Sequence, residues 1–310
     1  MAKGSLIRFD WAIKRLLRNK ADYTVLEGFL SVLLNQKIKI ISIKESESNQ
    51  LFADDKFNRV DLLAEDSRGE LLIIEIQNNY EVDYYLRMLY GVSKAITEHI
   101  RRGDRYDKVR KVYHINIIYF KLSEGIDYVY HGFTEFRGIH SNDILPLTQE
   151  QKKFFMKEKV MDLYPEYWVL CVENFDNVAK DSLDEWIYYL KNTAVKESFT
   201  AQGLKEVREQ LTYDNLTEQE QQDYDHHVDQ RVYEQSVIDD SYFKGRFEGE
   251  EEGRAEGRAE GRAEGRTETL ERIVLDGCNN GFSLEQIGII TKLSVEQIER
   301  ILWQNDVRFG

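Results

Sequence analysis

The sequence NRVDLLAEDSRGELLIIEIQ, residues 58–77, decides how the first half of this chain is expected to fold. Two apolar runs flank the segment DSRG at 66–69, which suits a type I turn followed by a left-handed glycine, as in a three-residue hairpin loop with a bulge. That turn fixes the register so that Asp61 lies directly opposite Glu75. Because side chains along a strand alternate between faces, Gln77 shares the face of Glu75. The hairpin is therefore predicted to bring Asp61, Glu75 and Gln77 together.

Carboxylates in such a position indicate a metal site. Placing Asp61 and Glu75 within runs of Leu, Ile and Val costs several kcal/mol if the two groups are buried and unpaired. A shared cation removes that cost, and oxygen ligands at this spacing suit Mg²⁺ or Mn²⁺, which also bind phosphate oxygens. Such an ion can activate water for attack on a phosphodiester. The other interpretation is a pair of solvated carboxylates on an exposed strand face.

The segments around the hairpin predict an α/β (α+β) fold, with a mixed sheet flanked by helices and a mostly helical C-terminal half. Helices are predicted where apolar residues recur every three to four positions, and strands where β-branched and aromatic residues cluster. The order helix, strand, hairpin, helix, strand is typical of such a sheet. The predicted helices cover 9–17, 23–35 and 84–100 and the predicted strands 38–43 and 112–120, with further strands within 126–172 and mostly helix over 183–244.

Composition and charge narrow the class of protein. The chain has 310 residues, of which 42% are hydrophobic, and its two cysteines form no metal-binding or disulfide pattern. Since no apolar run reaches the roughly 18 residues of a membrane helix and the N-terminus does not resemble a signal peptide, we expect a cytoplasmic protein with no membrane contact. The net charge of −14 resides in residues 151–310, which hold 20 basic and 34 acidic residues, whereas residues 1–150 hold 22 of each.

A basic stretch in the neutral first half is the expected place for DNA contact. Arg101, Arg102 and Arg105 lie with three further basic residues within the eleven positions 101–111. Clustered positive charge attracts nucleic-acid phosphates. A solvated helix end followed by a loop is the alternative interpretation.

These residues resemble the signature of a known nuclease superfamily. Asp61, followed fourteen residues later by Glu75-Ile76-Gln77, is similar to the Asp…Glu-X-Lys signature of PD-(D/E)XK nucleases. The triplet resembles the Glu-X-Gln form that is common in the recombination-promoting nuclease (Rpn) family, a group of PD-(D/E)XK nuclease family transposases. The resemblance extends over roughly residues 8–200, and the segments most similar to the family are 25–35, 45–50, 54–61 and 84–95.

The resemblance implies a restriction-endonuclease-like fold and a metal-dependent DNA endonuclease linked to recombination, mobile elements or defence. It implies that Asp61 and Glu75 hold Mg²⁺ or Mn²⁺. It also implies that Glu27 adds a carboxylate or orients a water, and that Gln77 stands where many relatives have lysine. Glu27 lies beside the apolar stripe of its helix, which is compatible with an inward-facing role, although an ordinary surface glutamate is the other interpretation.

Glutamine at position 77 has chemical consequences. An amide cannot supply the positive charge that lysine gives to a transition state. Arg87 and Lys94 share a face of the helix that follows the hairpin, so either could provide the missing cation. The alternative is a catalytically weak or inert nuclease fold that acts as a DNA-binding or assembly module.

Residues 249–266 repeat with a period of four, most clearly as GRAEGRAEGRAEGR. Along a helix, neighbours at i and i+4 then carry like charges and each glycine costs roughly 1 kcal/mol relative to alanine, so a lone helix should be unstable. Neighbouring helices that approach along the Gly and Ala stripes, with a Glu row facing an Arg row, would make the pattern favourable. We therefore expect a homo-oligomer formed through residues 245–302, with a disordered linker as the alternative.

The C-terminal segment 281–302 predicts two short helices, each opened by a capping box, Ser283/Gln286 and Ser294/Gln297. The pair resembles a helix-turn-helix unit, but its shortage of basic residues also favours an oligomerisation cap. The expected domains are a nuclease-like domain at 1–200, a helical extension at 201–244, a connector helix at 245–268 and a terminal unit at 269–310.

Overall fold

A computed structural model describes residues 4–18, 22–44, 62–305 and 307 of the chain. Asp61 and the segments 45–50 and 54–61, which carry part of the family resemblance, lie outside the described residues. The chain divides into two compact units, Met1–His227 and Val228–Gly310, which are described separately. No helix in the described part of the chain is both long enough and apolar enough to span a membrane.

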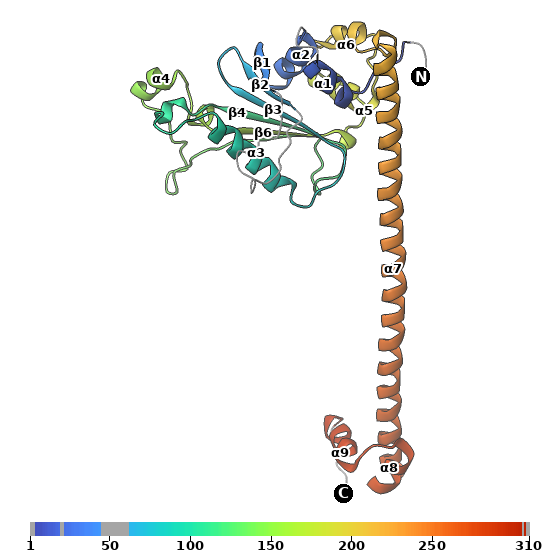
Figure 1. Ribbon diagram of the computed structural model, residues 1–310. Coiled ribbons are helices and arrows are strands. Elements are labelled where there is room, and N and C mark those ends of the chain that lie inside the picture. The colour runs from blue at the N-terminus through green and yellow to red at the C-terminus, as the bar shows by residue number, and fades with distance from the viewer. Residues whose placement is uncertain (1–3, 19–21, 45–61, 306, 308–310) are drawn as a thin grey trace. The chain divides into compact units, whose positions relative to one another are not determined.

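The first unit contains the predicted mixed sheet (Figure 1). Its described strands follow the order β1-β2-β3-β4-β6-β5, in which β3, β4 and β6 are parallel and the remaining neighbours are antiparallel. The strands are β1 (Ile40–Lys44), β2 (Leu62–Asp66), β3 (Leu71–Gln77), β4 (Val112–Ile118), β5 (Val129–Gly132) and β6 (Glu166–Cys171). The α-helices are α1 (Phe9–Arg18), α2 (Thr24–Leu33), α3 (Tyr84–Glu98), α4 (Gln149–Phe155), α5 (Ser182–Asn192), α6 (Leu204–Gln210) and the start of α7 (Glu218–Asn279). Short 3₁₀ helices are η1 (Tyr106–Lys108), η2 (Val160–Leu163), η3 (Val172–Asn174) and η4 (Tyr213–Asn215).

The β2–β3 hairpin has the predicted turn. Gly69 adopts φ +78°, a conformation that glycine accepts without strain. The backbone N–H of Asp66 donates to the carbonyl of Glu70 at 3.0 Å, and that of Gly69 donates to the carbonyl of Asp66 at 2.9 Å. The register pairs Leu62 with Ile74, as predicted. The turn and the register are thus confirmed over the described residues, and the pairing of Asp61 with Glu75 stays a prediction.

Helix α3 covers one face of the sheet. The odd-numbered residues of β3 point toward α3, where Leu71 and Ile73 pack with Val92 and Ala95. Met88 of α3 packs further along the same face, against β4 and β6. Glu75 and Gln77 continue the same alternation, so they belong to the face that α3 covers.

The opposite face of the sheet is also buried. Leu72 and Ile74 of β3 and Ile115 of β4 point away from α3 and are inaccessible to solvent. Figure 1 shows α1, α2 and α5 on this side of the sheet. These three helices are joined by edge-to-face and tilted aromatic contacts that include Phe9, Phe29 and Trp186, a compact apolar cluster. The arrangement of two helical layers around a mixed sheet confirms the predicted fold class.

The second unit contains most of α7, followed by α8 (Leu284–Thr291) and α9 (Val295–Gln304). Both predicted capping boxes are present, with Ser283 and Ser294 as N-caps. The small core of this unit consists of Val274, Ile287, Ile298 and Leu302. The six glycines from Gly245 to Gly265 lie within α7, and a Cβ added at any of them would meet no described atom within 4 Å. The division into four domains stays a prediction.

Candidate active site

Glu75 is a buried carboxylate to which the described residues donate no hydrogen bond. Glu75 is only 2% exposed, and neither of its carboxylate oxygens has a hydrogen-bond partner among the described residues. The Nε atom of Arg87 and the Nε2 atom of His114 each lie 3.8 Å from its Oε2 atom. Since burying a carboxylate without hydrogen bonds is costly, this position is suited to a group that brings positive charge.

His114 of β4 lies on the same face as Glu75 and is fully buried. Neither ring nitrogen has a hydrogen-bond partner in the described part of the chain. Asn116, which pairs with Glu75 across β3 and β4, forms its side-chain hydrogen bonds with other residues. Its Oδ1 accepts from the Tyr84 hydroxyl at 3.0 Å, and its Nδ2 donates to the carbonyls of His114 and Trp168, each at 3.2 Å. The neighbouring amide therefore does not satisfy Glu75.

Gln77 and Arg87 are held by one carboxylate, that of Glu81. Its Oε1 accepts hydrogen bonds from Gln77 Nε2 and from Arg87 Nη1, each at 2.7 Å. Burial opposes the charged form of Arg87, but the carboxylates of Glu75 and Glu81 outweigh this effect and raise the pKa of the guanidinium. A permanent positive charge thus stands beside Glu75.

Glu27, the other candidate carboxylate, and Lys94, the other candidate cation, have different partners. Glu27 accepts from the backbone N–H of Ile40 at 2.9 Å and from Lys39 Nζ at 3.0 Å, which ties α2 to the start of β1. Lys94 lies 3.8 Å from Glu98 on its own helix. Among the described contacts, neither Glu27 nor Lys94 reaches Glu75.

Sequence reasoning did not include His114, Asn116 or Glu81 in the site. The signal available for the first two was their alternation within the apolar run of residues 112–118, the pattern that singled out Glu75 and Gln77. Nothing in the sequence predicted which strand would lie beside β3. Glu81 follows β3 in a polar segment, where a glutamate carries no distinguishing signal.

The described residues alone do not form a metal site. Within 4–18, 22–44, 62–305 and 307, no group of three or more His, Cys, Asp or Glu side chains could hold a metal ion. The expected second ligand, Asp61, lies outside these ranges. The two unbonded oxygens of Glu75 have the donor chemistry that a hard divalent cation requires, so the described residues fit such an ion.

The basic stretch after α3 is only partly available for DNA. Arg101, Arg102 and Arg105 are exposed, and Arg105 lies 3.5 Å from Asp107 and 5.8 Å from the ring centroid of Phe154. Arg110 and Lys111 are less exposed, and they form ion pairs with Glu65 and Glu166, respectively. A cavity of about 780 Å³ lies in this region, lined among others by Arg105, Tyr106, Arg110, Phe154 and Tyr164.

Comparison with known proteins adds one finding. Residues 7–241 match the model of a family described as PD-(D/E)XK nuclease family transposase. No curated protein and no solved structure matches the chain. The matched range includes the sheet, the helices on both of its faces and the predicted carboxylates.

Proposed function

The chain belongs to the PD-(D/E)XK nuclease family transposases, and we propose that it is a DNA endonuclease that depends on Mg²⁺ or Mn²⁺. Its context, by family resemblance, is recombination, mobile elements or defence. The proposal concerns hydrolysis of phosphodiester bonds and does not extend to strand transfer, for which no residue has been identified.

The observation that supports this proposal most strongly is the buried carboxylate of Glu75, for which the described part of the chain provides no hydrogen-bond donor. An ordinary structural glutamate at this position would be expected to have hydrogen-bond donors. Two nearby donors, the Asn116 amide and the Nη1 atom of Arg87, are instead directed to other acceptors. Such an arrangement is favourable when a cation completes the site.

In the proposed site, Asp61 and Glu75 hold the divalent ion. When bound, the ion supplies Lewis-acid activation of water and of the phosphodiester. Arg87 provides the fixed positive charge that Gln77 cannot provide, and Glu81 holds both side chains in position. Glu27 is retained as a proposed accessory carboxylate.

The proposed partners are DNA and further copies of the same chain. Arg101, Arg102 and Arg105 are the proposed phosphate contacts, and their exposure supports this role. Self-association through residues 245–302 is supported by the open glycine positions on α7. It is further supported by two large apolar side chains of the second unit, Ile289 and Trp303, each 80% exposed.

Cleavage of supercoiled plasmid DNA in Mg²⁺ or Mn²⁺ tests the proposal. Wild-type protein should nick or linearise the plasmid, and Glu75→Gln and Asp61→Asn should each reduce the rate at least about a hundredfold, as expected for metal-dependent chemistry. Glu124→Gln, which changes an exposed carboxylate, serves as the matched control and should cleave normally. If the wild-type protein and both site variants are equally silent while DNA binding persists, the chain is a DNA-binding or assembly module and the enzyme proposal fails.

A further inference from the structure

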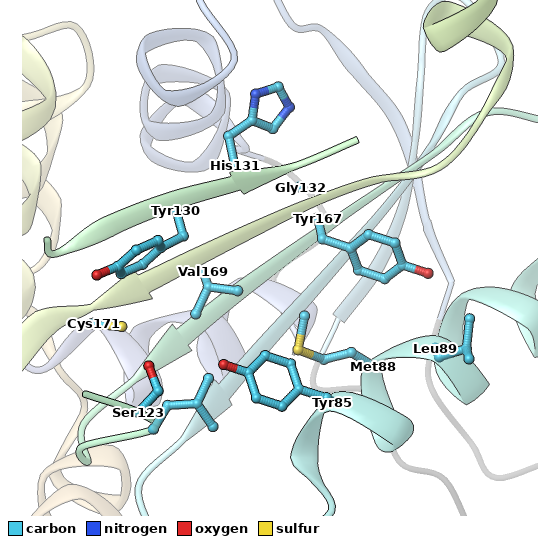
Figure 2. Close-up of a pocket in the computed structure, with 11 residues that line it drawn as sticks. Tyr85, Met88, Leu89, Ser123, Tyr130, His131, Gly132, Tyr167, Val169 and Cys171 are labelled. Atoms are coloured by element: carbon cyan, nitrogen blue, oxygen red, sulfur yellow. The ribbon is translucent and has the colours of Figure 1, made fainter. Parts of the chain in front are cut away.

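A cavity of about 510 Å³ lies on the α3 side of the sheet, between α3, β5 and β6 (Figure 2). Tyrosines from three elements line it, namely Tyr85 of α3, Tyr130 of β5 and Tyr167 of β6. Figure 2 shows the ring of His131 on the other side of β5. There it stacks on Trp168 with 4.0 Å between the ring centroids. The lining is therefore aromatic and apolar.

The described lining of this cavity is also uncharged. It contains no Lys, Arg, Asp or Glu side chain among the described residues. Burial raises the pKa of Tyr167, and burial together with Asp127 raises the pKa of the Cys171 thiol to about 11. Both groups are neutral at pH 7. A phosphate would find no countercharge here, whereas a neutral planar ring could stack on the tyrosines.

Gly132 leaves part of the cavity open. Glycine weakens a strand and is often found where a ligand approaches the backbone closely. A Cβ added at Gly132 would lie 3.5 Å from the Cβ of Tyr167, which is an ordinary van der Waals contact. The fold would accept a side chain at this position, so the glycine is not required to avoid a clash within the protein.

The cavity lies on the same face of the sheet as the candidate active site. Val169, which lines it, pairs with Asn116 of β4, and Asn116 pairs with Glu75 of β3. Paired residues point to the same face of the sheet, so Glu75 and the cavity share the face that α3 covers. Val169 and Glu75 are two strand spacings apart, a distance of about 10 Å. A stacked DNA strand covers this distance in about three nucleotides, at 3.4 Å each.

We propose that this cavity takes an unpaired nucleobase of the DNA substrate, about three nucleotides from the phosphate that is cut. The inference rests on the proposed function and specifies its substrate class. A base within a duplex is stacked and paired, and it must leave the helix before it can enter such a cavity. The preferred substrate is therefore single-stranded DNA, or duplex DNA with an unpaired base near the cleavage site.

Binding measurements on the full chain test this inference without relying on cleavage. The probe is an oligodeoxynucleotide with one 2-aminopurine, used single-stranded and as a duplex, in Ca²⁺ in place of Mg²⁺. Single-stranded probe should bind at least about tenfold more tightly than duplex, with its fluorescence quenched by stacking on tyrosine. Tyr85→Leu and Gly132→Leu should each weaken this binding by about fivefold to one hundredfold and reduce the quenching. Tyr85 is 56% exposed, so its replacement should leave folding intact.

Tyr90→Leu is the matched control, since Tyr90 lies on the same helix but outside the cavity lining, and it should bind like wild type. Equal affinity for both probes, or wild-type binding by both cavity variants, would overturn the inference. A changed oligomeric state of Tyr85→Leu in sedimentation would also overturn it, because the cavity would then be an interface between copies. Failure of the proposed function has a different signature: absence of metal-dependent cleavage by the wild-type protein, whatever the binding data show.

Discussion

The Nε2 atom of His114 lies 3.8 Å from the Oε2 atom of Glu75, and both side chains are buried on the same face of the sheet. Neither the imidazole nitrogens nor the carboxylate oxygens have hydrogen-bond partners among the described residues. Two adjacent buried groups with unused polar atoms are costly for folding. Their presence together supports the proposal that Glu75 belongs to an active site.

Replacing His114 should separate stability from activity. His114→Leu removes no described hydrogen bond, so the metal-free protein should melt at the same temperature as wild type or higher. Cleavage should fall about tenfold or more, because leucine removes the polar group that lies 3.8 Å from the Oε2 atom of the proposed metal ligand Glu75. Thermal unfolding in EDTA and plasmid cleavage measure the two effects. A clear loss of thermal stability with normal cleavage would assign His114 a structural role instead.

The two candidate cations of α3, Arg87 and Lys94, can be compared through their alanine variants. Arg87→Ala should reduce the cleavage rate by about a hundredfold, because a fixed positive charge beside developing negative charge typically contributes several kcal/mol. Lys94→Ala should have little effect, since the described ion pair of Lys94 is with Glu98 on its own helix. Neighbouring carboxylates raise the pKa of Arg87 above its ordinary value, so the guanidinium stays charged and the loss should be equal at pH 6 and pH 9. A larger loss for Lys94→Ala would reverse the assignment.

The hairpin shows how much of the site could be predicted from the sequence. The turn residues 66–69 fix the register, and strand alternation then places Glu75 and Gln77 on one face, as the structure has them. The position of His114 could not be predicted in this way. It depends on the parallel pairing of β3 with β4, two strands joined through α3, and no local pattern specifies which strand becomes the neighbour.

Glu27 shows a second feature that could not be predicted from the sequence. Its place beside the apolar stripe of α2 predicted that it faces inward, and it is buried. The sequence did not reveal that the backbone N–H of Ile40 would donate to it. Backbone partners of a side chain depend on the path of the connecting segment, which residue type and spacing do not encode.

The described contacts of Glu27 predict an effect on stability. Glu27→Ala should lower the free energy of unfolding by about 1–3 kcal/mol, because it leaves the buried N–H of Ile40 without an acceptor. Glu27→Gln keeps an acceptor oxygen and should cost less. Urea unfolding measures both values, and cleavage by the folded Glu27→Gln protein tests the accessory role. A rate near that of wild type would leave Glu27 with its structural role alone.

Self-association through α7 predicts opposite effects of small and large substitutions at its glycines. Gly257→Ala and Gly261→Ala should stabilise the helix by about 1 kcal/mol each and leave association intact. Leucine at the same two positions should block the close approach of a neighbouring helix and shift the full-length protein toward the monomer. Sedimentation velocity over a range of concentrations distinguishes the two sets. A mass that is monomeric for wild type, or unchanged by leucine, would contradict the association.

Asp61 and Glu75 are proposed to share one divalent ion. A crystal structure of the protein grown with Mn²⁺, with anomalous data collected near the manganese edge, tests this proposal. An anomalous peak is expected with a carboxylate oxygen of each residue at about 2.0–2.2 Å, the usual range for such ions. A structure in which the two carboxylates face opposite sides of the sheet, or in which Mn²⁺ binds elsewhere, would contradict it.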